Sequence, residues 1–386
     1  MSAQHDLLLR GGHVIDPRNG LDGVADVAIA GGKVAAVGPD LKGTAARLVD
    51  VSGLYVTPGL IDIHVHVFGG YIGWVFPDPH ALPYGVTTVV DTGGSGWRDM
   101  DTFRRTIMEP ATTRVLALLN IVGAGMTGGP EQDVREMDQR RCAEAVRTNA
   151  DVVVGTKSAH FGGAGWESAG GAIEAARQSG TIAMVDFAPQ PSRSYAELLE
   201  RMGPGDIHTH VYAAHIPLLD GERRVNGHVR AARERGVVFD TGHGGGSFWF
   251  RIAAPALEQG FPPDTISTDL HKASRVACDA VMPVTMSKFL GMGMPLAEVV
   301  ERSTWRPAQV IRRAELGHLS VGAEADVAVL ALRQGQFGFV DSGQARLDAR
   351  HRLECEMTIR AGRVVWDRNG RGRPDWRRAG DYRRLD

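Results

Sequence analysis

The 386-residue sequence predicts an α/β fold, in which a (β/α)8 TIM barrel carries a small β-sandwich domain formed from both chain ends. Two observations predict this architecture. The middle of the chain alternates eight short apolar runs with helix-compatible stretches over about 250 residues, the usual length of one barrel. The two ends instead share a glycine-turn pattern that is typical of antiparallel strands. A doubly wound open sheet is the competing fold for the middle.

The two ends of the chain resemble each other in sequence. Residues 9–20 align with residues 359–370, and each segment has the pattern of a short strand, a glycine turn and a second strand. A turn of the same kind occupies residues 29–38, where small or glycine residues precede a β-branched run. We therefore expect both ends to pair in one β domain.

These patterns predict the domain boundaries. Residues 1–58 and 317–370 form the two parts of the β-sandwich domain, and residues 59–316 form the inserted barrel. Residues 371–386 are rich in arginine, and we expect them to form a basic surface tail.

The eight predicted barrel strands are short apolar runs. The first of them has almost no polar residue on either face, as expected for a strand buried on both sides of a parallel sheet. Stretches such as residues 167–178 and 226–235 have the composition of the connecting helices. The predicted strands are residues 61–67, 85–91, 114–121, 151–157, 181–186, 206–212, 236–240 and 265–269.

Polar side chains end or directly follow these runs. The active site of a (β/α)8 barrel lies at the carboxyl ends of its strands, so we expect these residues to come together. They are His64, His66, Asp91, Lys157, Asp186, His208, His210, His243 and Asp269.

His64 and His66 are the most informative of these residues. Side chains two apart on a strand point the same way, so the His-x-His pair presents two imidazoles to one side. Neutral imidazole is a common metal ligand, and the pair therefore indicates a metal site. The alternative is a pair of hydrogen-bonded core histidines.

Composition excludes several classes of protein. The net charge of -2 shows no basic excess, which argues against a nucleic-acid partner. The three cysteines lie far apart and form no CxxC motif, so we expect a reducing, cytoplasmic location without disulfides. The sequence shows neither a signal peptide nor an apolar run long enough for a membrane span. We expect a homo-oligomer that acts on a small-molecule substrate, with no nucleic-acid or membrane partner.

Several motifs lie at the start of the chain and at the predicted strand ends. They are Gly12-x-Val14-Ile15-Asp16-Pro17, residues 57–66 with the two histidines, Gly155-Thr156-Lys157, Thr209-His210, and residues 242–248 and 266–271. In combination they resemble the amidohydrolase superfamily. Within it they are most similar to the bacterial amidohydrolase and deacetylase group, whose members include enzymes once labelled dihydroorotases. The resemblance extends to about residue 366.

The resemblance implies a set of metal ligands. His64 and His66 would bind the more buried metal ion, and His210 would bind a second ion, with His208 as the rival for that role. Lys157 would react with carbon dioxide to form a carbamate that bridges the two ions. The alternative for Lys157 is a solvated lysine at a strand end.

Asp269 has two implied roles, as a metal ligand and as the catalytic acid and base. A metal lowers the pKa of a bound water, and a neighbouring carboxylate can then take a proton and return it to the leaving group. The alternative for Asp269 is an N-cap of the following helix. His243, Asp91 and His271 are candidates for substrate binding or for supporting the ligands.

Asp186 departs from the family pattern, which has a histidine at the end of the fifth barrel strand. If Asp186 binds the second ion, two divalent ions would be neutralised by carbamate, Asp269, Asp186 and hydroxide. A neutral cluster favours a hard ion such as Mn²⁺ more than a histidine site would. Alternatively, Asp186 only hydrogen-bonds, with His160 or His208 as a substitute ligand or with none. We therefore expect one or two Zn²⁺ ions, with Mn²⁺ as the alternative.

The predicted function is a metal-dependent amidohydrolase or deacetylase. It would hydrolyse an amide or ester bond of a small acylated amino or hydroxy acid through a metal-activated water. Arg98, Arg251 and Arg275 are candidates to meet a substrate carboxylate. The alternatives are a cyclic amide or imide hydrolase of the dihydroorotase and hydantoinase kind, and a non-catalytic binding protein with the same fold.

Overall fold

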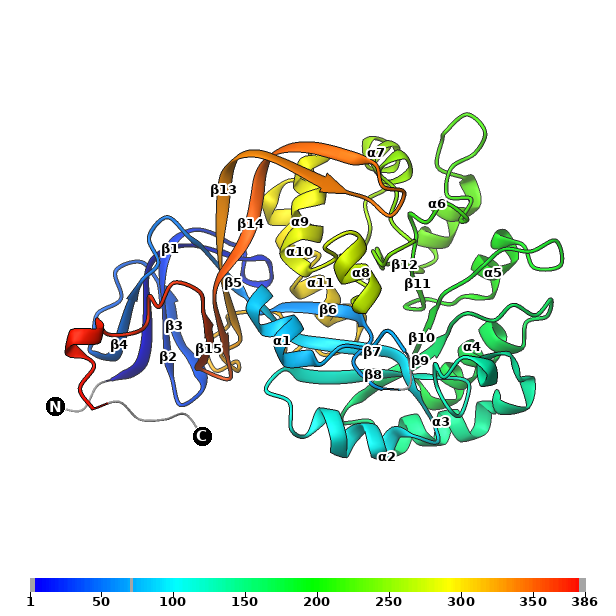
Figure 1. Ribbon diagram of the computed structural model, residues 1–386, viewed down its shortest axis with the longest axis horizontal. Coiled ribbons are helices and arrows are strands. Elements are labelled where there is room, and N and C mark those ends of the chain that lie inside the picture. The colour runs from blue at the N-terminus through cyan, green and yellow to red at the C-terminus, as the bar shows by residue number, and fades with distance from the viewer. Residues whose placement is uncertain (1–3, 70–71, 382–386) are drawn as a thin grey trace.

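The computed structural model describes residues 4–69 and 72–381 of the chain. Its strands form two sheets, one of eight strands and one of seven. Figure 1 shows the eight-stranded sheet at one end of the molecule and the seven-stranded sheet, with most of the helices, at the other.

The seven-stranded sheet is parallel throughout, and its strands lie side by side in chain order. This arrangement is what repeated strand-helix units produce, because each crossover places the next strand beside the last. The sheet curls, and its strands overlap the first seven predicted runs, although β7 is longer than predicted and β11 and β12 are shorter. They are β6 (Leu60–Val65), β7 (Val86–Gly96), β8 (Arg114–Asn120), β9 (Val153–Ser158), β10 (Ile182–Val185), β11 (Ile207–His208) and β12 (Val238–Phe239).

The eighth predicted strand, residues 265–269, is not a regular strand. Its segment instead forms isolated parallel bridges at both edges of the curled sheet. Thr265 pairs with Asp240, directly after β12, and Leu270 pairs with Val65 of β6. Between these two bridges, the carbonyls of Ser267 and Thr268 accept hydrogen bonds from the backbone N–H groups of His243 and Gly244, which ties the segment to the loop after β12.

Helices follow the parallel strands and cover the outside of the sheet. The predicted helix at residues 167–178 forms as α4 (Glu167–Ser179), whose alanine-rich face is buried, and the one at 226–235 forms as α6 (Gly227–Glu234). The other α-helices are α1 (Pro77–Ala81), α2 (Met100–Phe103), α3 (Gln139–Thr148), α5 (Tyr195–Arg201), α7 (Phe250–Glu258), α8 (Lys272–Ala277), α9 (Met282–Gly291), α10 (Leu296–Glu301) and α11 (Trp305–Val310). The 3-10 helices are η1 (Pro17–Asn19), η2 (Leu82–Tyr84), η4 (Gly129–Gln132), η5 (Val134–Glu136) and η6 (Trp376–Arg378), and η3 (Arg104–Met108) is a π-helix that continues α2.

The eight-stranded sheet combines strands from both ends of the chain. Its order is β15-β14-β13-β5-β1-β2-β3, with β4 paired to β1, and it has its own apolar core. The strands are β1 (His5–Asp16), β2 (Leu21–Ala30), β3 (Lys33–Gly38), β4 (Ala45–Asp50), β5 (Tyr55–Pro58), β13 (Val327–Val340), β14 (Arg346–Arg360) and β15 (Arg363–Asp367).

One predicted turn in this sheet is wrong. Gly11 and Gly12 do not reverse the chain, because β1 continues through them with a bulge between Leu9 and Gly12. Gly11 has a φ of 72°, and a Cβ there would lie 2.7 Å from Ser52 Oγ. The bulge falls where β1 changes its parallel partner from β4 to β5, so the strand bends instead of turning. The predicted turns between β2 and β3 and between β14 and β15 are present.

Strands β13 and β14 extend beyond the sheet as a long hairpin, here called the β13–β14 arm, which reaches across α9 to α7 (Figure 1). Its tip binds the segment before α7. The backbone N–H of Phe248 donates to Ser342 Oγ (3.1 Å), and that of Phe250 donates to Asp341 Oδ2 (2.9 Å). The arm therefore anchors a loop that follows β12.

Two further predictions concern the surface. No helix within residues 4–69 and 72–381 is long and apolar enough to cross a membrane. The described part of the predicted tail, residues 371–381, is mostly exposed, and residues 382–386 lie outside the described residues.

Candidate metal centre

A cavity of about 630 Å³ lies at the carboxyl ends of the parallel strands. The position agrees with the rule that barrel-type sites collect residues from several strand ends. Its lining includes all six side chains that the sequence analysis named as metal ligands. They are His64, His66, Lys157, Asp186, His210 and Asp269.

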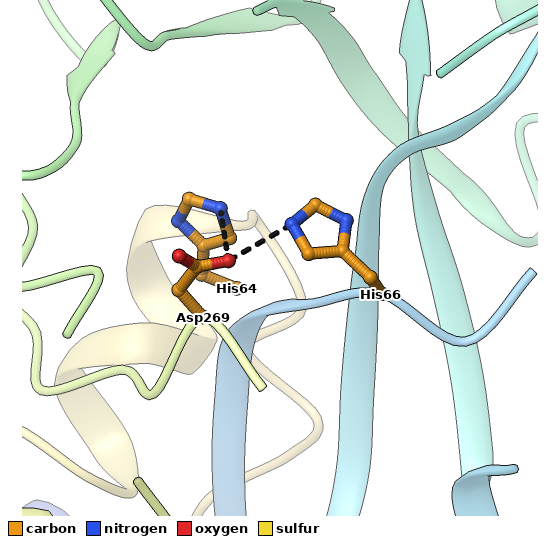
Figure 2. A group of neighbouring side chains, drawn as sticks. All are labelled: His64, His66 and Asp269. Atoms are coloured by element: carbon orange, nitrogen blue, oxygen red, sulfur yellow. Dashed lines mark ion pairs between the residues drawn. The ribbon is translucent and has the colours of Figure 1, made fainter. Parts of the chain in front are cut away.

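His64, His66 and Asp269 form the tightest group in this cavity (Figure 2). Asp269 Oδ1 lies 2.9 Å from His66 Nε2 and 3.6 Å from His64 Nε2. One potential ligand atom from each of the three residues lies within 4.8 Å of the others, and all three residues are buried. Two imidazole nitrogens and a carboxylate oxygen are a donor set that suits zinc.

The ring of His64 is oriented from behind by hydroxyl groups. His64 Nδ1 lies 2.8 Å from Thr209 Oγ1, and that hydroxyl donates to Asp240 Oδ2 (2.8 Å). Because the threonine proton is used on Asp240, His64 Nδ1–H must donate to the threonine oxygen, which leaves the Nε2 lone pair toward Asp269. Asp240 also accepts hydrogen bonds from Thr265 (2.6 Å) and Ser267 (2.7 Å). Such support fixes the tautomer that a metal ligand needs.

Protonation states fit the same donor set. Burial, together with the nearby Lys157 ammonium, holds the pKa of His64 well below its ordinary value, so the ring is neutral. Burial alone would raise the pKa of Asp269, but His64 and His66 outweigh it and lower that pKa. His64 therefore offers a lone pair, and Asp269 offers a negative charge.

Asp269 is not a helix N-cap, because His271 occupies the N-cap position of α8. The backbone of Asp269 has a φ of 46°, a left-handed conformation that aspartate tolerates better than most residues. Gly244 lies directly against the carboxylate, since a Cβ on Gly244 would be 2.2 Å from Asp269 Oδ2. Oδ1 thus faces the two histidines, and Oδ2 faces Gly244 and His271, whose Nε2 is 4.0 Å away.

Lys157 lies at the end of β9 and is 1% exposed. Its Nζ atom has no hydrogen-bond partner among the residues that the structure describes. Burial lowers the pKa of Lys157, although Asp186 and Asp269 act in the opposite direction. Gly93 makes room for the side chain, because a Cβ there would be 2.8 Å from Lys157 Cγ. The solvated alternative for Lys157 does not fit this burial.

His210 and His208 do not share a face, contrary to the alternation expected for a strand. His210 has a φ of 62°, which breaks the alternation and turns its ring to within 5.0 Å of the His64 ring centroid. His210 Nδ1 lies 2.7 Å from the Gly242 carbonyl, so it donates there and leaves Nε2 for the cavity. His208 instead packs against Tyr195, at 5.0 Å between ring centroids, and burial lowers its pKa to about 3.

Asp186 reaches the cavity beside His210. Its Oδ2 lies 3.7 Å from His210 Nε2 and 3.9 Å from His160 Nε2. Burial would raise the pKa of Asp186, but His210 and Lys157 lower it, so the carboxylate is ionised. His160 also lines the cavity, and its Nδ1 is 3.0 Å from Glu131 Oε2, which raises the pKa of His160.

Of the three predicted substrate contacts, only His271 lines the cavity. The Asp91 carboxylate accepts hydrogen bonds from the backbone N–H groups of Val67 (2.7 Å), Phe68 (3.1 Å) and Gly94 (2.7 Å), so it fixes the turn after His66. His243 is fully buried and bonded to a lysine on α9, behind the cavity wall. Sequence position alone did not show which way these two side chains point.

The three candidate arginines also lie outside the cavity lining. Arg98 pairs with Glu136, Arg275 pairs with Asp279, and Arg251 packs over the Trp249 ring. Arg193 and His215 line the cavity instead, on loops where no motif singled them out. The Arg193 guanidinium donates to the carbonyls of Phe161 (3.1 Å), Gly165 (3.3 Å) and Ala188 (3.3 Å).

Comparisons with known proteins cover most of the chain. A profile of the amidohydrolase family matches residues 55–365. A deacetylase of Agrobacterium fabrum is 35% identical over 334 residues, which cover 82% of this chain and 81% of the relative. A solved structure of an adenine deaminase is 28% identical with a TM-score of 0.86, covering 94% of this chain and 100% of that one. A solved dihydroorotase is 30% identical with a TM-score of 0.83, covering 94% and 99%.

Proposed function

The chain belongs to the amidohydrolase family and is a hydrolase acting on carbon-nitrogen bonds; within this family, we propose that it removes the acyl group from small acylated amino or hydroxy acids. The observation that carries the proposal is the convergence of six ligand-type side chains from separate strand ends on one cavity. The deacetylase relatives, which match most of the chain, support acyl removal over other reactions of the family.

We propose that the cavity holds one or two divalent ions, zinc or manganese. His64, His66 and Asp269 would hold the first ion, and His210 and Asp186 would hold the second. The fit rests on the imidazoles of His64 and His210. Their Nδ1 atoms donate to Thr209 and to the Gly242 carbonyl, which leaves each Nε2 atom free to bind an ion. When bound, such an ion polarises a carbonyl group and lowers the pKa of a bound water.

Lys157 would complete the site as a carbamate. A neutral amine attacks carbon dioxide, a nitrogen-carbon bond forms, and one proton leaves the nitrogen, which yields an anion with two oxygens. Burial favours the neutral amine that this reaction requires, and Nζ has no hydrogen-bond partner within residues 4–69 and 72–381 that would hold it back from reacting. The product would place an anionic ligand beside Asp186 and His210.

Asp269 Oδ2 is the atom that we assign to proton transfer. Oδ1 is committed to His64 and His66, whereas Oδ2 faces the side of the cavity where His271 stands. Asp269 would take a proton as water attacks the acyl carbon and return it to the leaving nitrogen or oxygen. Gly244 shields the other side of this oxygen.

Cyclic amide or imide hydrolysis is the second candidate. The solved dihydroorotase, with a TM-score of 0.83 over 94% of this chain, supports it. A non-catalytic binding protein is not retained, since the chain belongs to a family of hydrolases.

A second proposal concerns how the curled sheet is closed. We propose that residues 265–270 close the curled sheet into a (β/α)8 barrel, because they bridge to both edges. We also propose residues 1–58 and 317–370 as the β-sandwich domain, residues 59–316 as the barrel and residues 371–386 as a surface tail.

A substrate panel tests the proposed function. Purified protein loaded with Zn²⁺ or Mn²⁺ is incubated with N-acetyl amino acids, O-acetyl hydroxy acids, dihydroorotate, hydantoins and adenine, and His66→Ala serves as the control. We expect acetate release from acylated acids by the wild type only. Turnover confined to the cyclic amides would replace the proposal by the second candidate, and turnover of adenine alone would contradict both.

A further inference from the structure

Lys288 is a buried cation that the proposed reaction does not use. It lies on α9, is fully buried, and does not line the cavity. Its Nζ donates to His243 Nε2 (2.7 Å) and to the Cys278 carbonyl (3.1 Å). No carboxylate within residues 4–69 and 72–381 forms an ion pair with it, although burying an unpaired charge is costly.

The ammonium group determines the tautomer of His243. A lysine ammonium can only donate, so His243 Nε2 must accept and the ring proton lies on Nδ1. Nδ1 then donates to the Gly244 carbonyl at 2.9 Å. Phe248 stacks on the imidazole at 4.6 Å between ring centroids, which holds the ring plane.

These bonds fix the position of Gly244. Its N–H donates to the Thr268 carbonyl at 2.9 Å, while its own carbonyl accepts from His243. Cys278 Sγ also approaches that carbonyl, at 3.6 Å. Gly244 is thereby held against Asp269 Oδ2, which a Cβ at this position would meet at 2.2 Å.

The same ammonium connects two walls of the cavity. Residues 245–247, directly after Gly244, line one wall. Cys278, whose carbonyl is the second acceptor of Lys288, follows α8, and α8 provides Ala273 and Ala277 to the other wall. The buried Lys288 ammonium thus bonds to His243, close to the first wall, and to Cys278, close to the second.

We infer that Lys288 is a positioning residue for Asp269, acting through His243 and Gly244. It sets the His243 tautomer, holds the glycine loop against Asp269 Oδ2, and so keeps Oδ1 toward His64 and His66. This inference rests on the proposed proton-transfer role of Asp269. Because metal-site supports of this kind change activity by roughly 10- to 100-fold, the effect of losing Lys288 should fall in that range.

The test compares Lys288→Met with a matched variant on the same helix. Ser287→Ala is the control, because Ser287 is equally buried but accepts from Leu353 N–H of the β13–β14 arm (2.8 Å). We expect Lys288→Met to lower kcat roughly 10- to 100-fold with little change in KM. Ser287→Ala should lower the melting temperature without that loss of kcat. Lys288→Gln, which keeps an uncharged donor, should retain more activity than Lys288→Met and serves if the latter fails to fold.

A second pair of variants addresses His243 itself. His243→Gln keeps an acceptor for Lys288 and a donor for Gly244, whereas His243→Phe keeps only the ring that stacks on Phe248. We expect the glutamine variant to retain clearly more kcat than the phenylalanine variant. Equal kcat in these two variants would overturn the inference.

A readout without substrate separates this inference from the proposed function. Long-range ¹H–¹⁵N spectra of protein labelled at histidine report the tautomer of each ring, and the His243 signals are those absent from His243→Gln. We expect a wild-type ring protonated at Nδ1 only, and a changed tautomer or a mixture in Lys288→Met. An unchanged ring with full kcat in Lys288→Met would overturn the inference even if every substrate proposal failed.

Discussion

Two buried lysines of this chain have opposite surroundings. Lys157 stands at the end of β9 in the cavity, and its Nζ has no hydrogen-bond partner among the described residues. Lys288 stands on α9 behind the cavity wall, and its Nζ donates to an imidazole and to a carbonyl. The difference suggests that a buried lysine without partners is suited to react or bind, whereas one with partners is suited to hold other groups in place.

The charged groups around the two lysines also differ. Lys157 faces ligand-type groups, including Asp186 and Asp269, that would surround an ion. Burial lowers the pKa of Lys288 to about 8, and the influences that oppose it come from Cys278, Asp279 and Asp341. The comparison therefore predicts effects of different size and kind when each lysine is changed.

The largest effect is expected for Lys157→Ala. Loss of a bridging ligand removes several kcal/mol of transition-state stabilisation, which corresponds to about 10³-fold or more in kcat/KM. Short carboxylates such as formate or propionate should restore part of the activity by replacing the carbamate, whereas they should not help Lys288→Met. Rescue of both variants by carboxylates would contradict this comparison. So would rescue of neither variant, if Lys157→Ala kept the metal content of the wild type.

Asp186 should have the next largest effect, because it stands between Lys157 and His210. If it binds the second ion, Asp186→Ala should retain about one ion per chain, and Asp186→His should retain two with a shift of preference toward zinc. Metal analysis after dialysis measures both. Wild-type content and preference in both variants would mean that Asp186 is not a ligand, and the site would then hold one ion or be completed by His160.

The smallest effect concerns stability near Lys288. Burial lowers the pKa of Lys288 from 10.5 to about 8, so between these values the unfolded chain binds more protons than the folded one. Stability from this group therefore rises with pH across that window and is lost as pH falls through 8. The groups facing Lys288 are His243, Cys278, Asp279 and Asp341, and Lys288 in turn acts to lower the pKa of His243 and of Cys278. The difference between wild type and Lys288→Met therefore reports the titration of Lys288 together with these neighbours.

Urea unfolding of the wild type and of Lys288→Met, below pH 8 and near pH 10, measures the contribution of Lys288 to the free energy of unfolding. We expect the free energy of unfolding of the wild type, relative to Lys288→Met, to increase toward pH 10 by at most a few kcal/mol. A difference that stays flat across the window would show that Lys288 does not titrate there.

Strand ends were the most predictable part of the site. Apolar runs marked β6 to β12, and the rule that barrel sites form at carboxyl ends then selected the residues that meet in the cavity. Side-chain direction was less predictable, because it depends on backbone angles that a pattern does not reveal. His210 turns into the cavity through a positive φ, so it does not share a face with His208, although the two lie two residues apart.

The supporting residues were hidden for a different reason. Asp91, Asp240 and Lys288 bond to backbone, hydroxyl or imidazole groups far away in sequence, and one chain read alone shows no such partners. The glycines at 11 and 12 had the composition of a turn, but the change of partner strand made them a bulge. Long-range contacts, more than local propensity, decided these positions.

Metal content measured together with turnover tests the central claim most directly. Wild-type protein, His64→Ala and His66→Ala are analysed for bound ions, stripped with a chelator, reloaded with Zn²⁺ or Mn²⁺, and assayed at each step for acetate release from acylated acids. We predict at least one ion per wild-type chain, activity that disappears and returns with that ion, and little metal or activity in either variant. Full turnover by demonstrably metal-free wild-type protein would contradict the account.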